Sequence, residues 1–236
     1  MYHVFNELFR KEGISVIKAV VFDLDGTLLD RDTSLKHFIS SQYKEFAEYL
    51  SHIPEQQFCS RFIEIDNKGY VWKDKVYQLL IEEFQIEGIT VDILLQHYIE
   101  NFKYYCIAFP HLLPMLKELK EMSLPLGIIT NGKGRFQLDN INALKISSFF
   151  DVILVSELEG LKKPDAPIFH RALERLKVAP QESLYIGDHP INDIDGANLV
   201  GMHTIWKKDL AYNCFEADFI INDLSEIPLI IRTLSV

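Results

Sequence analysis

Two aspartates, spaced two positions apart, follow an apolar run near the start of the chain. Residues 19–22 are strand formers, and Asp23 and Asp25 come directly after them, followed by Gly26 and Thr27. Residues i and i+2 of an extended strand point the same way, so we expect the two carboxyl groups to lie side by side. Two such groups repel each other and lose water on burial, and a cation between them offsets that cost. An ordinary acidic turn is the alternative, because Asp-Gly is common in turns.

Other polar segments follow apolar runs later in the chain. Thr130 could simply cap a helix, Lys163 could be a surface lysine beside Lys162, and the last acids suit a helix N-terminus. Taken separately, those interpretations do not predict that such groups recur in this order after strand-like runs. The segments are Thr130-Asn131-Gly132, Lys163-Pro164, Gly187-Asp188 and Asn192-Asp193.

Phosphoryl transfer is the chemistry that this set of side chains could perform. Asp23 would be a carboxylate nucleophile. Asp25 would protonate the leaving oxygen and later take a proton from water. Mg²⁺ prefers hard oxygen ligands, and we expect Asp23 and Asp188 to bind it.

The negative charge of a phosphoryl group must also be compensated by the protein. Lys163 would supply a positive charge, and Thr130, with Asn131 and the backbone amides after it, would donate hydrogen bonds to phosphoryl oxygens. These three residues are our predicted phosphate-binding group.

The spacing of apolar residues along the chain predicts the strands and helices that position these residues. Strand-like and helix-like segments alternate after residue 108, which predicts an α/β fold with a Rossmann-like parallel sheet and helices on both faces. Ligands of such sheets bind beyond the carboxyl ends of the strands, where Asp23, Thr130 and Asp188 fall. The predicted strands are 16–22, 125–130, 152–155, 183–187, 203–206 and 219–221, and the main predicted helices are 111–122, 165–177, 191–200 and 224–234.

Between the first strand and the rest of the sheet lies a block with helical periodicity. Apolar residues between 33 and 106 recur at helical spacing and predict four helices, with breaks near Pro54, Gly69 and Gly88. This block shows none of the buried carboxylate chemistry of the segments that follow strand-like runs. An inserted helical unit beside an active-site edge can act as a lid.

The predicted domain organisation follows from these patterns. Residues 16–31 and 108–236 form the α/β core, and residues 32–107 form an inserted all-helical cap domain. Residues 1–15 are an N-terminal extension in which apolar residues fall at helical spacing and predict a short amphipathic helix.

A loop in the helical block is a candidate for contacting the substrate. Residues 67–75 combine two aromatic side chains with three lysines, and Trp72 and Lys73 are our predicted contacts. An exposed basic turn with one anchoring tryptophan is an equally good interpretation.

Composition excludes several classes of function. The chain has 236 residues and a formal net charge of −10, which disfavours binding to nucleic acid. No apolar run approaches the roughly 20 residues of a membrane span. The three cysteines, Cys59, Cys106 and Cys214, are widely spaced, which favours reduced thiols and a cytoplasmic location. The oligomeric state is not readable.

The ordered motifs resemble those of the haloacid dehalogenase-like (HAD) hydrolase superfamily, in the phosphatase branch with a helical cap inserted after the first motif. The resemblance covers residues 18–222 or so. The matching segments are Asp23-Leu24-Asp25-Gly26-Thr27, Thr130-Asn131-Gly132, Lys163-Pro164 with residues 165–169, and Gly187-Asp188 through Asn192-Asp193 with Gly196-Ala197.

The resemblance implies a role for each matched position. Asp23 is expected to become phosphorylated, and Asp25 to act as the acid and base. Magnesium is expected to be bound by Asp23, the backbone carbonyl of Asp25 and Asp188, with Asp193 supporting the site from outside the ligand shell. Lys163 is the lysine that precedes the proline, so the lysine role falls to it.

One position departs from the pattern of the superfamily. His189 follows Gly187-Asp188 where members often have a small serine. We interpret it as a tolerated loop variation, and the alternative is a contact with the leaving group or with a ligand residue.

We therefore expect a Mg²⁺-dependent phosphatase that hydrolyses small phosphorylated metabolites through an aspartyl-phosphate. A phosphoglucomutase-like phosphotransferase keeps every motif and stays an alternative. A haloacid dehalogenase would not need Asp25. A phospho-receiver domain is about half as long and lacks Asp25 and the insertion, and a binding protein without catalysis is disfavoured because no motif residue is missing.

Overall fold

The computed structural model describes residues 16–212 and 216–234, which form two compact units. The described part of the first unit comprises residues 16–28, Phe109–Gln137, 146–212 and 216–234, and the second unit comprises Leu29–Ala108 and Leu138–Lys145. The amphipathic helix predicted within residues 1–15 lies outside the described residues. None of the helices in the described ranges has the length and apolar character needed to cross a membrane.

The first unit is built on a six-stranded sheet in which every neighbouring pair is parallel. The strand order is β3-β2-β1-β4-β5-β6, and this confirms the predicted α/β fold with a Rossmann-like sheet. The strands are β1 (Ala19–Phe22), β2 (Leu126–Thr130), β3 (Val152–Val155), β4 (Ser183–Gly187), β5 (His203–Lys207) and β6 (Phe219–Ile221).

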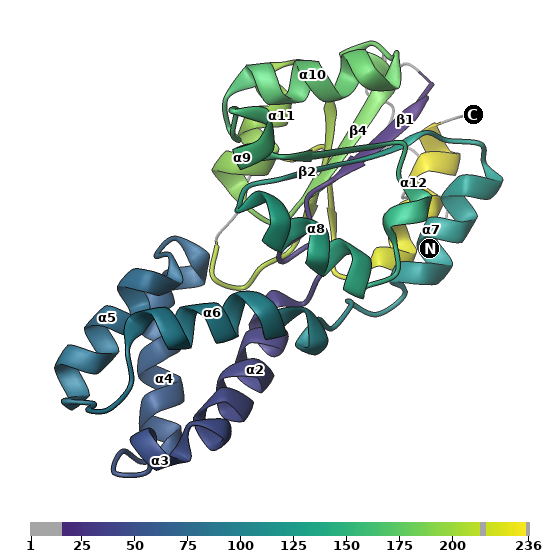
Figure 1. The fold of residues 1–236 in the computed structure, drawn as a ribbon. Helices are drawn as coiled ribbons and strands as arrows, with labels where there is room; N and C mark the ends of the chain where they lie inside the picture. Colours follow the sequence, from purple (N-terminus) through teal and green to yellow (C-terminus); the bar gives the residue numbers. More distant parts are fainter. Residues whose placement is uncertain (1–15, 213–215, 235–236) are drawn as a thin grey trace. The chain divides into compact units, whose positions relative to one another are not determined.

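Helices cover both faces of this sheet, which is why its strands are almost wholly apolar. Figure 1 shows α10 and α11 on one side and α7 and α12 on the other. On the first side, Val21 of β1 belongs to one buried cluster with Phe169 and Leu173 of α10. The helices of this unit are α7 (Leu112–Glu121), α9 (Ser156–Glu159), α10 (Ala166–Leu176), α11 (Gly196–Leu199), α12 (Ile227–Leu234) and the start of α8 (Gly134–Ala143).

The order of the strands reverses direction beside β1. The chain passes from β1 outward to β2 and β3, and then returns to β4 on the other side of β1. Open α/β sheets bind ligands at such a reversal, outside the carboxyl ends of the strands. The residues that follow β1, β2 and β4 therefore meet at the place where this fold class binds its ligands.

One predicted helix is present but differs in type. A helix was expected over residues 191–200, and the chain is helical from 190 to 199, as a π-helical segment, Pro190–Asp195, followed directly by the one-turn α-helix α11. His189 caps the start of this segment, because its Nδ1 accepts hydrogen bonds from the backbone amides of Ile191 and Asn192, at 3.1 and 3.0 Å. Asp193 lies within the π-helical segment and is buried at 1% exposure.

The second unit is helical, as its periodicity predicted. Its α4 begins after Pro54, and left-handed backbone at Asn67 and Gln85 ends α4 and α5. A one-turn helix, α3, is added to the four that were predicted. The helices are α2 (Arg31–Glu45), α3 (Ala47–Leu50), α4 (Glu55–Asp66), α5 (Lys73–Phe84) and α6 (Val91–Asn101).

The helical unit contains a buried carboxylate that the sequence did not indicate. Asp66 is 1% exposed and accepts hydrogen bonds from Arg31 Nη2, at 2.8 and 3.0 Å, and from the Lys73 ammonium. It also caps the following turn by accepting from the Gly69 amide at 2.9 Å. Burial is tolerated because two cations compensate the single negative charge.

Replacing Asp66 with asparagine should destabilise the helical unit strongly. The change leaves the buried Lys73 without its charged partner, and breaking a buried ion pair in this way costs about 3–5 kcal/mol. Urea denaturation followed by far-UV circular dichroism measures the loss. Glu83→Gln removes an ion pair with Arg61 at the surface and serves as the control, which should shift the midpoint little. Equal shifts for both variants would contradict this assignment.

Candidate active site

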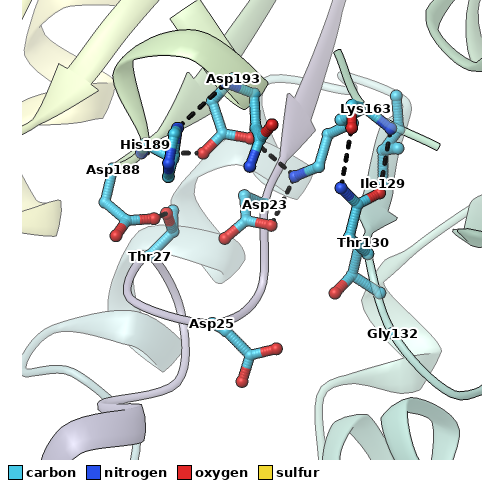
Figure 2. Close-up of polar contacts among 12 residues, drawn as sticks. Asp23, Asp25, Thr27, Ile129, Thr130, Gly132, Lys163, Asp188, His189 and Asp193 are labelled. Atoms are coloured by element: carbon cyan, nitrogen blue, oxygen red, sulfur yellow. Dashed lines mark hydrogen bonds and ion pairs between the residues drawn. The ribbon is translucent and has the colours of Figure 1, made fainter. Parts of the chain in front are cut away.

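A buried lysine, Lys163, links two carboxylates at the carboxyl edge of the sheet. Its Nζ donates to Asp23 Oδ1 and to Asp193 Oδ1, at 2.6 Å in each case (Figure 2). The Nζ atom also lies 3.0 Å from the Tyr185 hydroxyl. Burial lowers the pKa of a lysine, but the attraction of Asp193 and Asp23 outweighs it and raises the pKa of Lys163 well above its usual value. Lys163 is therefore fully charged at neutral pH.

Asn131 aligns this lysine through its backbone. The Asn131 side-chain amide donates to the Lys163 carbonyl and accepts from the Lys163 amide, at 2.9 Å in both directions. Both polar atoms of the side chain are thus engaged in one reciprocal pair. The predicted contact of Asn131 with phosphate remains a prediction, and the structure gives Asn131 a role in positioning Lys163.

Asp23 directly follows β1 and is held in place by the sheet. Its amide donates to the Ile186 carbonyl at 2.9 Å, which extends the pairing of β1 with β4 by one residue. Burial raises the pKa of Asp23 to about 7, the Asp193 and Asp25 carboxylates add to the rise, and Lys163 opposes it. A carboxylate nucleophile must be ionised, so the site calls for more positive charge than Lys163 supplies.

Asp188 follows β4 and faces the turn that contains Gly26. Its Oδ1 accepts a hydrogen bond from the Thr27 hydroxyl at 3.3 Å. Burial raises the pKa of Asp188 well above its usual value, and repulsion from the Asp23 carboxylate is the next largest cause of the rise. Gly26 has a φ of +88°, and a Cβ there would lie 2.3 Å from Asp188 Oδ2. Only glycine fits, because of both the backbone conformation and the close approach.

Both carboxylate oxygens of Asp193 accept hydrogen bonds. Its Oδ1 accepts from Lys163 and from the Tyr185 hydroxyl, at 2.6 and 3.2 Å, and its Oδ2 accepts from the His189 amide at 2.9 Å. The first turn of the loop is therefore locked around this carboxylate. Such an arrangement suits the supporting role that the sequence predicted for Asp193.

Three carboxylates gather closely enough to hold a small cation. Asp23, Asp188 and Asp193 each offer one oxygen, and these oxygens lie within 4.8 Å of one another. The donor set is all oxygen and carries more negative charge than Lys163 neutralises, which fits a hard divalent cation. Because both oxygens of Asp193 are engaged, Asp23 and Asp188 are the better candidates for direct ligands.

The Asp25 carboxyl does not lie beside that of Asp23, so this expectation was wrong. The extended strand ends at Phe22, and the alternation that would align residues 23 and 25 stops with it. Figure 2 shows the Asp25 carboxyl pointing away from Lys163, while Asp23 points toward it. The carboxyl of Asp25 is also outside the cluster that could hold a cation. Its backbone carbonyl stays the predicted ligand.

Thr130 ends β2 with its hydroxyl buried at the same edge. The side chain of Gln137, from the first turns of α8, donates from Nε2 to Thr130 Oγ1 and to Asp25 Oδ2, at 2.6 Å in each case. Sequence reasoning missed Gln137, because no motif marks it and only the turn between β2 and α8 brings it back to Thr130.

Two further residues of the site were also missed. Tyr185 lies within β4, and a tyrosine inside a buried strand is usually a residue of the hydrophobic core. Its hydroxyl, however, contacts Lys163 and Asp193. Lys207 ends β5 and donates to the Gly26 carbonyl at 2.9 Å. The rule that ligand-binding residues follow the carboxyl ends of strands could have found Lys207.

Trp72 and Lys73, the predicted substrate contacts, make contacts with other residues of the helical unit. Lys73 is 2% exposed, and its ammonium is paired with Asp66. The Trp72 ring lies edge-on to Tyr98, with ring centroids 6.3 Å apart. Both side chains contribute to packing and ion pairing here, and their contact with substrate remains a prediction.

The chain matches known proteins over most of its length. The family described as "Haloacid dehalogenase-like hydrolase" matches residues 20–207. A glyceraldehyde 3-phosphate phosphatase of Pyrococcus furiosus is 29% identical over 89% of this chain and 91% of its own. One of Methanocaldococcus jannaschii is 30% identical over 93% of this chain and 99% of its own. The crystal structure of a HAD phosphatase from Thermococcus onnurineus superposes with a TM-score of 0.67, at 26% identity, over 93% of this chain and 100% of that one.

Mg²⁺ should raise the melting temperature of the protein, and Gly26→Ala should abolish that rise. A methyl group at this position overlaps the Asp188 carboxylate and pushes it out of the cluster. A thermal-shift titration with MgCl₂ measures the effect, and Asp188→Asn should abolish the rise in the same way.

Gly160→Ala provides a matched control for Gly26→Ala. Gly160 is also left-handed, with a φ of +63°, but a Cβ there meets nothing within 4 Å. Both substitutions carry a backbone penalty of about 1 kcal/mol, and only Gly26→Ala should lose the response to Mg²⁺. A normal response in Gly26→Ala would contradict the proposed placement of the cation.

Proposed function

The chain belongs to the haloacid dehalogenase-like hydrolase family, in its phosphatase branch, and we propose that it hydrolyses small phosphomonoesters with Mg²⁺ through an aspartyl-phosphate intermediate. The observation that carries the proposal is the buried cluster of Asp23, Asp188, Asp193 and Lys163 at the carboxyl ends of adjacent strands. Within this cluster, Lys163 contacts Oδ1 of Asp23, and the other oxygen of Asp23 has no hydrogen-bond partner among the described residues.

In the first half of the reaction the phosphoryl group moves to Asp23. A carboxylate oxygen of Asp23 attacks phosphorus, the bond from phosphorus to the ester oxygen breaks, and its electron pair stays on that oxygen. Asp25 delivers a proton to the departing oxygen, so an alcohol leaves and Asp25 becomes a carboxylate. Such acid catalysis is worth roughly 10²–10⁴-fold.

In the second half water releases the phosphate. The Asp25 carboxylate takes a proton from a water molecule while the water oxygen attacks phosphorus. The bond between phosphorus and Asp23 breaks, inorganic phosphate leaves, and both aspartates return to their starting states. One residue thus serves as acid in the first half and as base in the second.

Charge compensation in both halves comes from groups already in place. Lys163 lies 2.6 Å from Asp23 Oδ1 and so meets any phosphoryl group on that carboxylate. The Thr130 hydroxyl ends β2, next to β1, and can donate to a phosphoryl oxygen. Bound Mg²⁺, held by Asp23 and Asp188, would offset the repulsion between the carboxylate and the substrate.

The substrate class is a small phosphorylated metabolite. Two relatives are named for glyceraldehyde 3-phosphate, which makes three-carbon phosphate esters the first compounds to test. A phosphoglucomutase-like phosphotransferase has the same first half-reaction and differs in the acceptor, a sugar hydroxyl in place of water. A cytoplasmic location is also part of the proposal and depends on the widely spaced cysteines of the sequence.

Phosphate release with Mg²⁺ should be measurable across a panel of phosphate esters. The panel contains p-nitrophenyl phosphate, glyceraldehyde 3-phosphate, sugar phosphates, nucleotides and acyl phosphates, each with Mg²⁺ and with EDTA. We expect release from at least one member, lost with EDTA. If no member of the panel releases phosphate, the phosphatase proposal is wrong. Isomerisation of a sugar phosphate without release of phosphate would favour the phosphotransferase.

Replacing each aspartate separates the two half-reactions. Asp23→Asn should abolish turnover with the fold intact, because an amide oxygen is a poor nucleophile. Asp25→Asn should accumulate phosphorylated protein with p-nitrophenyl phosphate, whose leaving group needs little protonation. Intact-protein mass spectrometry detects the added phosphoryl group. Turnover by Asp23→Asn would remove Asp23 as the nucleophile.

A further inference from the structure

Beyond the residues of the proposed reaction, we infer that Gln137 is a positioning residue. It holds the Asp25 carboxyl and the Thr130 hydroxyl in fixed positions relative to each other. This inference rests on the proposed phosphatase function. It concerns a side chain that belongs to none of the four motifs and that no metal-binding or nucleophilic role requires.

The geometry places one amide nitrogen between the two groups. Gln137 Nε2 lies 2.6 Å from Asp25 Oδ2 and 2.6 Å from Thr130 Oγ1. The side chain is 2% exposed, and its backbone amide donates to the Lys133 carbonyl at 3.0 Å, within the helix start. A Cβ on Gly132 would lie 2.9 Å from Gln137 Cγ, so a small residue at that position leaves room for the side chain.

The direction of these hydrogen bonds follows from the chemistry of the partners. Asp25 Oδ2 can accept a hydrogen bond both in the carboxylate and in the acid that carries its proton on Oδ1, so the nitrogen of the amide faces Asp25 in both states. A primary amide has two hydrogens, and the second one points to Thr130 Oγ1. Because the Thr130 oxygen accepts from Gln137, its own hydrogen is directed elsewhere. No described residue accepts it, and a phosphoryl oxygen would.

The same arrangement leaves one oxygen of Asp25 ready for proton transfer. Gln137 holds Oδ2, and Oδ1 has no hydrogen-bond partner among the described residues. In the first half-reaction the proton moves from Asp25 to the departing ester oxygen, and in the second it moves from water to Asp25. Fixing Oδ2 restricts rotation of the carboxyl group, which keeps the other oxygen in one direction for both transfers.

A comparison of leaving groups tests this role. Gln137→Met keeps the size of the side chain and removes both donors. An alkyl phosphate needs a proton from Asp25 on its leaving oxygen, whereas 2,4-dinitrophenyl phosphate does not. With Mg²⁺ present, we expect the single-turnover phosphorylation rate to fall at least about tenfold for the alkyl ester, a part of the roughly 10²–10⁴-fold worth of acid catalysis. The rate for the dinitrophenyl ester should change less than about threefold, so the ratio of the two rates is the readout.

A matched control separates this role from the cost of losing a buried amide. Gln42 is also fully buried, donates to the Leu94 carbonyl at 3.1 Å and accepts from the Tyr77 hydroxyl at 2.7 Å, all within the helical unit. Gln42→Met should lower the melting temperature without changing the ratio of the two rates. If Gln137→Met does not fold, Gln137→Asn, whose shorter amide cannot span both partners, is measured in its place.

A double substitution checks that the effect passes through Asp25. In an Asp25→Ala background the acid is absent, so Gln137→Met should leave the ratio of the two rates unchanged. A wild-type ratio in the single Gln137 variant, or an equal further loss in the double variant, overturns the inference and leaves the phosphatase proposal standing. A wild-type protein that releases phosphate from neither ester overturns both.

Discussion

The contact between the Lys163 ammonium and the Asp23 and Asp193 carboxylates is the interaction on which the site depends. All three side chains are buried, and none could stay ionised there alone, because the loss of water costs each of them several kcal/mol. Mutual compensation explains why so much of the surrounding structure is devoted to alignment. Asn131 holds the lysine backbone, Tyr185 contacts both lysine and carboxylate, and the π-helical turn supplies the His189 amide to Asp193.

The sheet makes this contact possible by its order of strands. β1 lies between β2 and β4, so residues that follow these three strands share one edge although they are distant in sequence. Each strand contributes a different kind of group: the proposed nucleophile after β1, a hydroxyl at the end of β2 and a candidate metal ligand after β4. Gly26 then lets the Asp188 carboxylate approach the first turn more closely than any side chain would permit. The order of the strands therefore determines which side chains meet at the site.

Much of the site was predictable because its parts obey local rules. Asp23, Thr130 and Asp188 were found from strand-like runs that end in polar residues, and Lys163 from its place in an ordered set. Prediction failed where a residue acts across a distance that no local pattern records. Gln137 reaches back from a helix, Tyr185 looks like core, and Asp66 is buried only because two cations surround it. The expected pairing of Asp23 with Asp25 failed for a simpler reason, since the strand ends one residue before Asp23.

The insertion of the helical segment between β1 and β2 has a consequence for how the chain is made. Val20 pairs with Leu126 on one side and with Leu184 on the other, so β1 leaves the ribosome long before either neighbour exists. The segment Leu29–Ala108 is helical, and helical units generally fold faster than parallel sheets because more of their contacts are local. The strand that precedes the proposed nucleophile therefore waits with both edges unpaired until β2 has been synthesised, and with one edge unpaired until β4 has been synthesised. Catalytic competence is thus among the last properties that the nascent protein acquires, and premature chain termination just before β4 leaves one edge of an apolar strand unpaired in place of an enzyme.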